Sequence, residues 1–309
     1  MPVSHNMRLV GAFFCVYAVW GTNFLAIKYM VETIPPLMAM GVRSVIAGAL
    51  MYGWARLRGG GNPSASEWKS ATLVGAILFL GAHGALAWGE TRVPSGAAAL
   101  VMATIPVWMV LGDWLAAKGT RPALAVWIGL ACGVLGLVVL TDPASLRSDN
   151  ASLAGFLVLL TSAPCWAIGS IIARGQPKLR PMTMTTGMQL MTGGVLLLIA
   201  ALLAGEVASF DPGAVTLRSV GALVYTIVFG SVVALTAYFW LLHNTSAALV
   251  GTYAFVNPLI AVAMGWAFAG EAITTRVILA AGLILAGVAA IMLTKNKSTV
   301  NRQRHPIPR

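Results

Sequence analysis

Two ionisable side chains lie inside long apolar stretches of this sequence, and they are the first candidates for chemistry. Arg43 follows Pro36 by seven residues, which places it about 10 Å along a helix at the helical rise of 1.5 Å per residue. His83 stands between glycines in the run 80–86. An ionisable group costs at least ~2.5–3.5 kcal/mol at the centre of a membrane-spanning helix, so a functional role is the default hypothesis for both.

Each of these two residues also has a structural interpretation. The guanidinium of Arg43 could hold a carboxylate through two parallel hydrogen bonds, which suits an amino-acid-like solute. It could instead extend toward the headgroups or pair with Glu90 at the end of the third apolar run. His83 could bind solute or relay protons near neutral pH, or it could simply bond to a backbone carbonyl.

Uncharged polar and aromatic residues in the apolar runs form a second group of candidate solute contacts. Trp20 and Trp166 occupy matching places in the two halves, away from the headgroup level where tryptophan usually anchors a helix. An indole N–H at that depth needs a partner, which favours a cavity wall, with plain packing as the alternative. The other candidates, for which interhelical hydrogen bonds are the common alternative, are Asn23, Ser170, Gln189, Tyr253 and Asn257.

Three prolines fall within apolar runs and predict bends or hinges. Pro106, Pro164 and Pro258 each remove one backbone donor and free the carbonyl four residues earlier. Such interruptions favour helices that line a cavity over helices in a close-packed rod.

Other kinds of chemistry have no motif in the sequence. It contains no Gly-rich loop ending in Lys and Ser/Thr, no nucleophile motif and no His/Glu cluster with metal-ligand spacing. The three cysteines, Cys15, Cys132 and Cys165, are far apart and predict neither a disulfide framework nor a zinc site. We therefore expect no cofactor and no enzymatic activity.

The composition places these residues in a membrane protein. Of 309 residues, 58% are hydrophobic and only 9% are charged, and the mean hydropathy is +0.84. Soluble domains carry roughly 25% charged residues. The composition excludes a soluble enzyme, a disordered chain and a nucleic-acid-binding module.

Apolar runs of about 20 residues, the length that crosses a bilayer, occur ten times along the chain. The connections between them are short, and none is long enough to form a domain. The first run is too long for a cleaved signal peptide, so we interpret it as a retained helix. The predicted spans are 9–31, 36–57, 68–89, 94–115, 122–140, 153–173, 181–204, 217–241, 247–268 and 276–294.

The loop charges predict the orientation of these spans. With a cytoplasmic N-terminus, most Lys and Arg residues fall in inside segments, and most acidic residues fall outside. We therefore expect both termini in the cytoplasm and interpret the basic tail 295–309 as an orientation anchor.

The two halves of the chain resemble each other. Trp20 and Trp166 are 146 residues apart, and the run that begins at Pro36 precedes a similar run at Pro181 by 145 residues. Gly75 and Gly84 precede Gly221 and Gly230 by 146 residues, and 95–106 resembles 246–258 with one gap. An odd number of spans per half inverts the second half, a plan that recurs in secondary transporters.

These features together resemble the EamA branch of the drug/metabolite transporter superfamily. The residues that carry the resemblance are Trp20-Gly21, Pro36 with Arg43 and Gly48, the run 95–99 with Pro106, and 254–258 with Gly270-Glu271. The resemblance covers roughly residues 8–294 and implies a bacterial inner-membrane exporter of small metabolites, often amino acids, with a central cavity. One departure is Lys118-Gly119 in the first half, where the second half has Gly270-Glu271, so a symmetric pair of acids is not expected there.

The sequence therefore predicts an all-α membrane protein of ten transmembrane helices in two inverted five-helix repeats, 8–141 and 152–294. The expected function is export of amino-acid-like solutes by alternating access, with a monomer or homodimer and membrane lipid around it. A broad drug-type exporter is the alternative within transport, and a membrane-embedded lipid-handling or transferase subunit is the alternative from another class. Small cation exporters of the superfamily depend on an acid in the first span, and the stretch 17–23 contains none.

Overall fold

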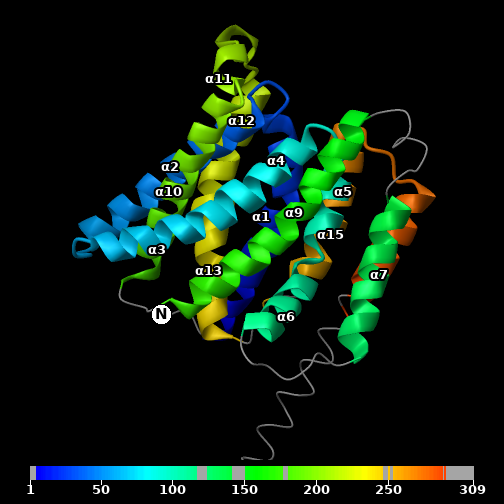
Figure 1. Cartoon of the computed structure of the whole chain (residues 1–309), viewed down its shortest axis with the longest axis horizontal. Helices are drawn as coiled ribbons and strands as arrows, with labels where there is room; N and C mark the ends of the chain where they lie inside the picture. The colour runs from blue at the N-terminus through cyan, green and yellow to red at the C-terminus, as the bar shows by residue number, and fades with distance from the viewer. Residues whose placement is uncertain are drawn as a thin grey trace, which may run out of the picture.

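The structure, a computed structural model, describes residues 5–116, 124–140, 150–176, 180–245, 250, 253–287 and 289. Every regular element in these ranges is helical (Figure 1). In the first half the elements are α1 (His5–Met30), α2 (Pro36–Leu57), α3 (Ala65–Gly75), η1 (Ala76–Gly84), α4 (Ala85–Glu90), α5 (Ser95–Met102), α6 (Ile105–Ala116) and α7 (Leu124–Leu140). In the second half they are α9 (Asn150–Gly175), α10 (Met182–Leu203), α11 (Glu206–Ser209), η2 (Pro212–Ala214), α12 (Leu217–Tyr225), η3 (Thr226–Val233), α13 (Ala234–Asn244), α15 (Tyr253–Ala269) and the helix Thr275–Gly287.

Within the described ranges, six helical stretches are long and apolar enough to cross a membrane. They are His5–Met30, Pro36–Leu57, Ala65–Glu90, Leu153–Gly175, Met182–Leu203 and Leu217–Leu241. Three shorter apolar helices accompany them, Ser95–Met109, Val256–Ala269 and Thr275–Gly287. The prediction of an all-α membrane protein is confirmed. The predicted tail 295–309 and the pair Lys118-Gly119 lie outside the described residues.

Prolines and glycines set several helix boundaries. Pro35 and Pro181 are the N-cap residues of α2 and α10 and share φ −52° and ψ 138°, an extended conformation from which the helix starts. The chain leaves α10 through Gly205, whose φ of 77° is a left-handed conformation that glycine adopts at little cost. The two helices therefore begin in the same way, as the sequence resemblance suggests.

The three internal prolines behave differently from one another. The helix breaks at Ala103 and Thr104, directly before Pro106, because proline has no N–H to donate to the preceding turn. Pro164 and Pro258 instead lie within the continuous helices α9 and α15. A local break is therefore visible only at the first of them.

Helices α2 and α10 cross in close contact through glycine. A Cβ added at Gly48 would lie 2.6 Å from the backbone N of Met191, and one added at Gly187 would lie 2.7 Å from the backbone N of Tyr52. Gly41 packs in the same way beside Leu198 and Gly194. Residues with higher numbers on α2 contact residues with lower numbers on α10, so the two helices are antiparallel at this contact.

The elements meet in two ends that serve as landmarks. The end that carries α11, uppermost in Figure 1, gathers the last turn of α1, the starts of α2 and α12 and the end of α15. We call it the α11 end. The first residues of α1 and the end of α13 lie at the opposite end.

Candidate functional site

A cavity lies between helices of both halves. Its walls come from α1, α2, the stretch η1–α4, α5–α6, α9, η3–α13 and α15. Fully buried side chains separate it from the α11 end, among them Ile27, Met30 and Met40. On the other side, Val16 and Leu241 are also buried. The cavity is therefore interior to the bundle.

The sequence candidates gather around this cavity. Seven of the nine predicted solute-contact residues line it, namely Trp20, Asn23, Arg43, His83, Trp166, Tyr253 and Asn257. Ser170 and Gln189 are not among its lining residues. Gln189 is buried in α10, where its backbone O lies against Gly75, and Ser170 interacts with Tyr238.

Aromatic rings form one wall of the cavity. Trp20 and Trp166 meet edge to face with centroids 6.0 Å apart, and Trp20 meets Tyr253 in the same way at 5.4 Å. His83 stacks on Trp166 at 5.2 Å with an interplanar angle of 21°. Stacked and edge-to-face pairs hold rings in fixed orientations. The wall is therefore a preorganised apolar surface that can take a side chain or a ring of a ligand.

Arg43 brings a positive charge into this apolar environment. The residue is only 3% exposed, its Nε donates to Ser231 Oγ at 2.9 Å, and its Nη1 contacts Met40 Sδ at 3.5 Å. The structure does not show the ion pair with Glu90 that the sequence allowed as an alternative, because neither Glu90 oxygen has a hydrogen-bond partner among the described residues. A neutral hydroxyl and a thioether orient the guanidinium without neutralising it.

Two π-helical segments, η1 and η3, shape the cavity. His83 lies on η1, and Gly230 and Ser231 lie on η3. The Gly230 carbonyl accepts a hydrogen bond from Trp20 Nε1 at 3.2 Å, and Ser231 Oγ donates to the Thr226 carbonyl at 3.1 Å. π-Helical turns are rare and occur frequently at functional sites. Hydrophobic periodicity cannot reveal such turns, so the role of Ser231 was missed.

Several buried polar atoms of the cavity wall have no hydrogen-bond partner in the described structure. They are Asn23 Oδ1, Asn257 Oδ1, His83 Nδ1 and Trp166 Nε1. An unpaired buried polar atom costs about 1–3 kcal/mol. The set offers two acceptors, one donor and one ring nitrogen that can act either way. Together with Arg43, it suits a small ligand that has both polar and apolar parts.

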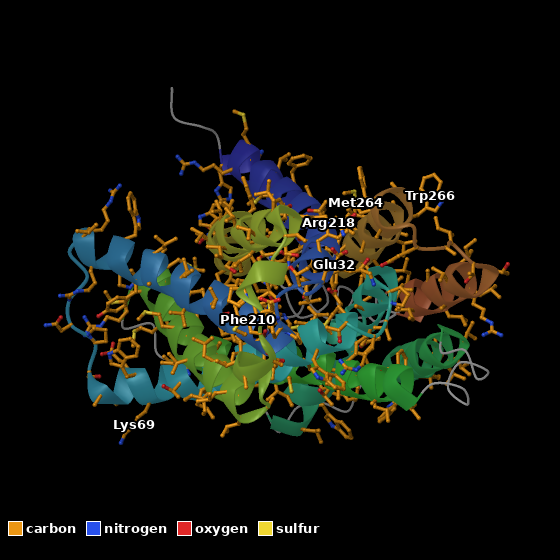
Figure 2. The ribbon with its side chains drawn as sticks, turned by 90° about the horizontal axis from the view of Figure 1, so that it is seen from above. Glu32, Lys69, Phe210, Arg218, Met264 and Trp266 are labelled. Atoms are coloured by element: carbon orange, nitrogen blue, oxygen red, sulfur yellow. The ribbon has the colours of Figure 1, made fainter. Side chains whose placement is uncertain are left out.

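The contacts at the α11 end hold the two halves together. Glu271, just after α15, accepts hydrogen bonds from Ser95 N at 2.8 Å and Gly96 N at 3.2 Å at the start of α5, and it lies 3.7 Å from Lys28 Nζ. Glu32 pairs with Arg218, and Figure 2, a view from above, shows both residues over the middle of the bundle, whereas Trp266 projects from its rim. Glu271 thus joins the segment after α15 to α1 and α5.

The opposite end has a different character. An apolar groove with an empty volume of about 1360 Å³ runs between α1, α2, α10 and η3–α13, with Arg8, Trp54 and Trp240 among its lining residues. Beside it, Arg180 pairs with Glu67 at 2.7 Å and donates to the Asn62 carbonyl at 2.9 Å. The groove gives this end a wide apolar surface.

Comparison with known proteins identifies the class of molecule. The description "EamA-like transporter family" matches the chain twice, over residues 8–142 and 153–293. The uncharacterized inner membrane transporter YedA of Escherichia coli (strain K12) is 35% identical over 297 residues, which cover 96% of this chain and 94% of YedA. The uncharacterized transporter YoaV of Bacillus subtilis (strain 168) is 26% identical, with 88% of this chain and 92% of YoaV covered. Protein PecM of Dickeya dadantii (strain 3937) is 25% identical, with 98% and 97% covered.

A solved crystal structure shares the fold. It aligns with a TM-score of 0.65 at 19% sequence identity and covers 95% of this chain and 99% of its own. At this level of identity the match concerns the fold alone.

Proposed function

Because the chain belongs to the EamA-like transporter family and is a multi-pass inner membrane transporter, we propose that it exports small amino-acid-like solutes by alternating access. The observation that carries the proposal is the buried guanidinium of Arg43 in the central cavity, held by Ser231 and with no carboxylate bonded to it among the described residues. A buried charge without a counter-ion is costly, and an anionic group on the solute would supply one.

The cavity can hold both polar ends of such a solute. Its carboxylate would bind to Arg43, while its ammonium group would donate to Asn23 Oδ1 or Asn257 Oδ1. Asn23 Oδ1 and Arg43 Nη2 both lie against Gly230, so an acceptor and a cation are available side by side, as the α-carbon substituents of an amino acid require. The side chain of the solute would then face the wall formed by Trp20 and Trp166.

Alternating access is supported by the relation between the two halves. The family description matches each half separately. Gly41 of α2 meets Gly194 of α10, and Gly48 of α2 meets Gly187 of α10. A shift of 146 residues turns Gly41 into Gly187 and Gly48 into Gly194, so it converts each pair into the other. An antiparallel contact with this exchange is what a two-fold relation between inverted repeats produces. π-Helical segments also interrupt corresponding spans, at η1 and η3.

The architecture proposed with this function follows the sequence prediction. It comprises ten spans in two inverted repeats, 8–141 and 152–294, with both termini and the tail 295–309 in the cytoplasm. Under this orientation the α11 end faces outward. Pro106, Pro164 and Pro258 are proposed as hinges, Ser170 and Gln189 as contacts that form in another conformation, and the assembly as a monomer or homodimer in lipid.

The proposal can be tested by solute counterflow in proteoliposomes with a panel of amino acids. Arg43→Gln is expected to lower transport efficiency about tenfold to a hundredfold, because a hydrogen bond to a charged group contributes about 1.5–3 kcal/mol. Arg43→Lys keeps the charge and should retain part of the activity. Arg58→Gln, which removes an exposed cation of the same type at the C-terminal end of the same helix but outside the cavity, serves as the matched control.

The main alternative is a broad drug-type exporter. The specific observation in its favour is the apolar groove lined by Trp54 and Trp240, through which an amphipathic compound could enter from the lipid. In that case a lipophilic dye would be exported, and the transport of the dye would be indifferent to Arg43→Gln. A lipid-handling or transferase subunit would require a cluster of reactive side chains that faces one leaflet. Nothing in the described part of the cavity supports this alternative.

A further inference from the structure

Glu90 is a buried acid at the α11 end of the cavity wall. It is the last residue of α4, at the end of the third apolar run of the sequence. In the structure it is only 1% exposed, and neither Oε1 nor Oε2 has a hydrogen-bond partner among the described residues. His83 and Leu86, which line the cavity, precede it by seven and four residues and therefore share its helix face.

The cations near Glu90 are engaged elsewhere. Lys28 of α1 pairs with Glu271, and Arg43 of α2 donates its Nε to Ser231. Arg92 follows in the next turn, but its guanidinium lies over the Trp88 ring at 3.7 Å. No donor therefore reaches the Glu90 carboxyl, although positive charge is close by.

Charged and titratable groups lie near Glu90 on several of the elements packed around it. Lys28 comes from α1, Arg43 from α2, His83 from its own helical stretch and Glu271 from the segment after α15. Helix α5 contributes only the hydroxyl of Ser95 at this level, and α9 carries no charged residue before Arg174 at its far end. Within this set, a carboxylate at Glu90 would add a second anion beside Glu271 with no hydrogen bond to stabilise it.

An ionised carboxylate that is buried without a donor is strongly disfavoured, whereas a neutral carboxylic acid is tolerated in the same place. Glu271, which bonds to Ser95 and pairs with Lys28, is the charged group of the segment after α15 that lies near Glu90. If these contacts separated, Glu90 could exchange a proton with the solution on that side.

We infer that Glu90 is the protonation site that couples solute export to a proton gradient. This inference rests on the proposed function for its transport direction. When the α11 end opens, the Glu90 carboxylate takes one proton from the outer solution and becomes a carboxylic acid. The acid stays neutral while the α11 end is closed, and when the cavity opens inward it releases that proton to the cytoplasm and returns to the carboxylate. One proton enters for each solute that leaves.

Infrared spectroscopy tests the protonation state without any solute. The spectrum of the purified protein at neutral pH minus that of Glu90→Gln should contain the C=O stretching band of a protonated carboxylic acid. The same subtraction with Asp211→Asn, which removes an exposed acid at the same end, should lack this band. Glu90→Asp keeps an acid and should shift the band without abolishing it. Absence of the band in the wild-type protein would overturn the inference.

Transport provides the second readout. In proteoliposomes, Glu90→Gln should retain counterflow of the solute found in the panel but lose the acceleration that an inward proton gradient gives the wild type. Asp211→Asn should respond to the gradient as the wild type does. An undiminished response in Glu90→Gln would refute proton coupling through this residue. Failure of all amino acids in counterflow would refute the proposed solute class and leave the infrared result standing by itself.

Discussion

The contact between α2 and α10 predicts how much an alanine in place of Gly48 lowers the free energy of unfolding. Alanine at position 48 would place its Cβ 2.6 Å from Met191 N and 2.7 Å from the Gly187 carbonyl oxygen, whereas ordinary contacts begin at 3.4 Å. Both neighbouring atoms belong to the backbone, so no side-chain rotation can relieve the overlap. The helices must move apart or bend.

Overpacking of this kind costs typically about 1–3 kcal/mol. Replacing a mid-helix glycine by alanine otherwise gains about 0.5–1 kcal/mol. Gly53→Ala is the matched control, because position 53 lies on the same helix and a Cβ there meets nothing within 4 Å. Both variants share this gain, so we expect Gly48→Ala to be less stable than Gly53→Ala by the overpacking cost alone, about 1–3 kcal/mol.

The measurement is reversible unfolding of the purified protein in mixed micelles, with each variant compared under the same conditions. Solute counterflow provides a second readout, since α2 also carries Arg43 and a displaced α2 would move the guanidinium relative to Ser231. If Gly48→Ala and Gly53→Ala unfold alike, the close crossing of α2 and α10 and the two-fold argument built on it are refuted.

Two further predictions concern the cavity and its closure. Trp20→Phe keeps an aromatic ring but removes the hydrogen bond to the Gly230 carbonyl. The solute affinity measured in a binding titration should fall several-fold, because one hydrogen bond contributes a net value of about 0.5–1.5 kcal/mol. Unchanged affinity would show that Trp20 Nε1 has no role in solute binding. Glu271→Gln weakens the contacts of Glu271 at the α11 end. A cysteine introduced at the fully buried Met30 should then react faster with a membrane-impermeant maleimide than it does without the Glu271 substitution. Equal reaction rates would show that Glu271 is not part of the closure.

The sequence identified much of the cavity because residues of unusual polarity stand out against an apolar background. Arg43, His83 and Asn257 could each be selected by their type alone, and the structure places all three around one cavity. Ser231 could not be selected in this way, since a single serine in an apolar helix is common and its role depends on Arg43, 188 positions away. Glu90 was noticed only as a possible partner of Arg43 at the end of the third apolar run, because its burial depends on how the other helices pack around it.

The membrane class and the internal resemblance of the halves could be predicted from the amino-acid sequence. Both follow from local properties, because the cost of placing a side chain in hydrocarbon belongs to each residue, and repeated residue types can be read along the chain. Which polar groups meet and which remain unpaired depends instead on how the helices pack. The π-helical turns at η1 and η3 rotate the residues that follow them relative to a regular helix. The helices of one half also supply partners for residues of the other half. For these reasons, spacing along the chain predicts neither the contacts of Arg43 nor the absence of hydrogen-bond partners at Glu90 among the described residues.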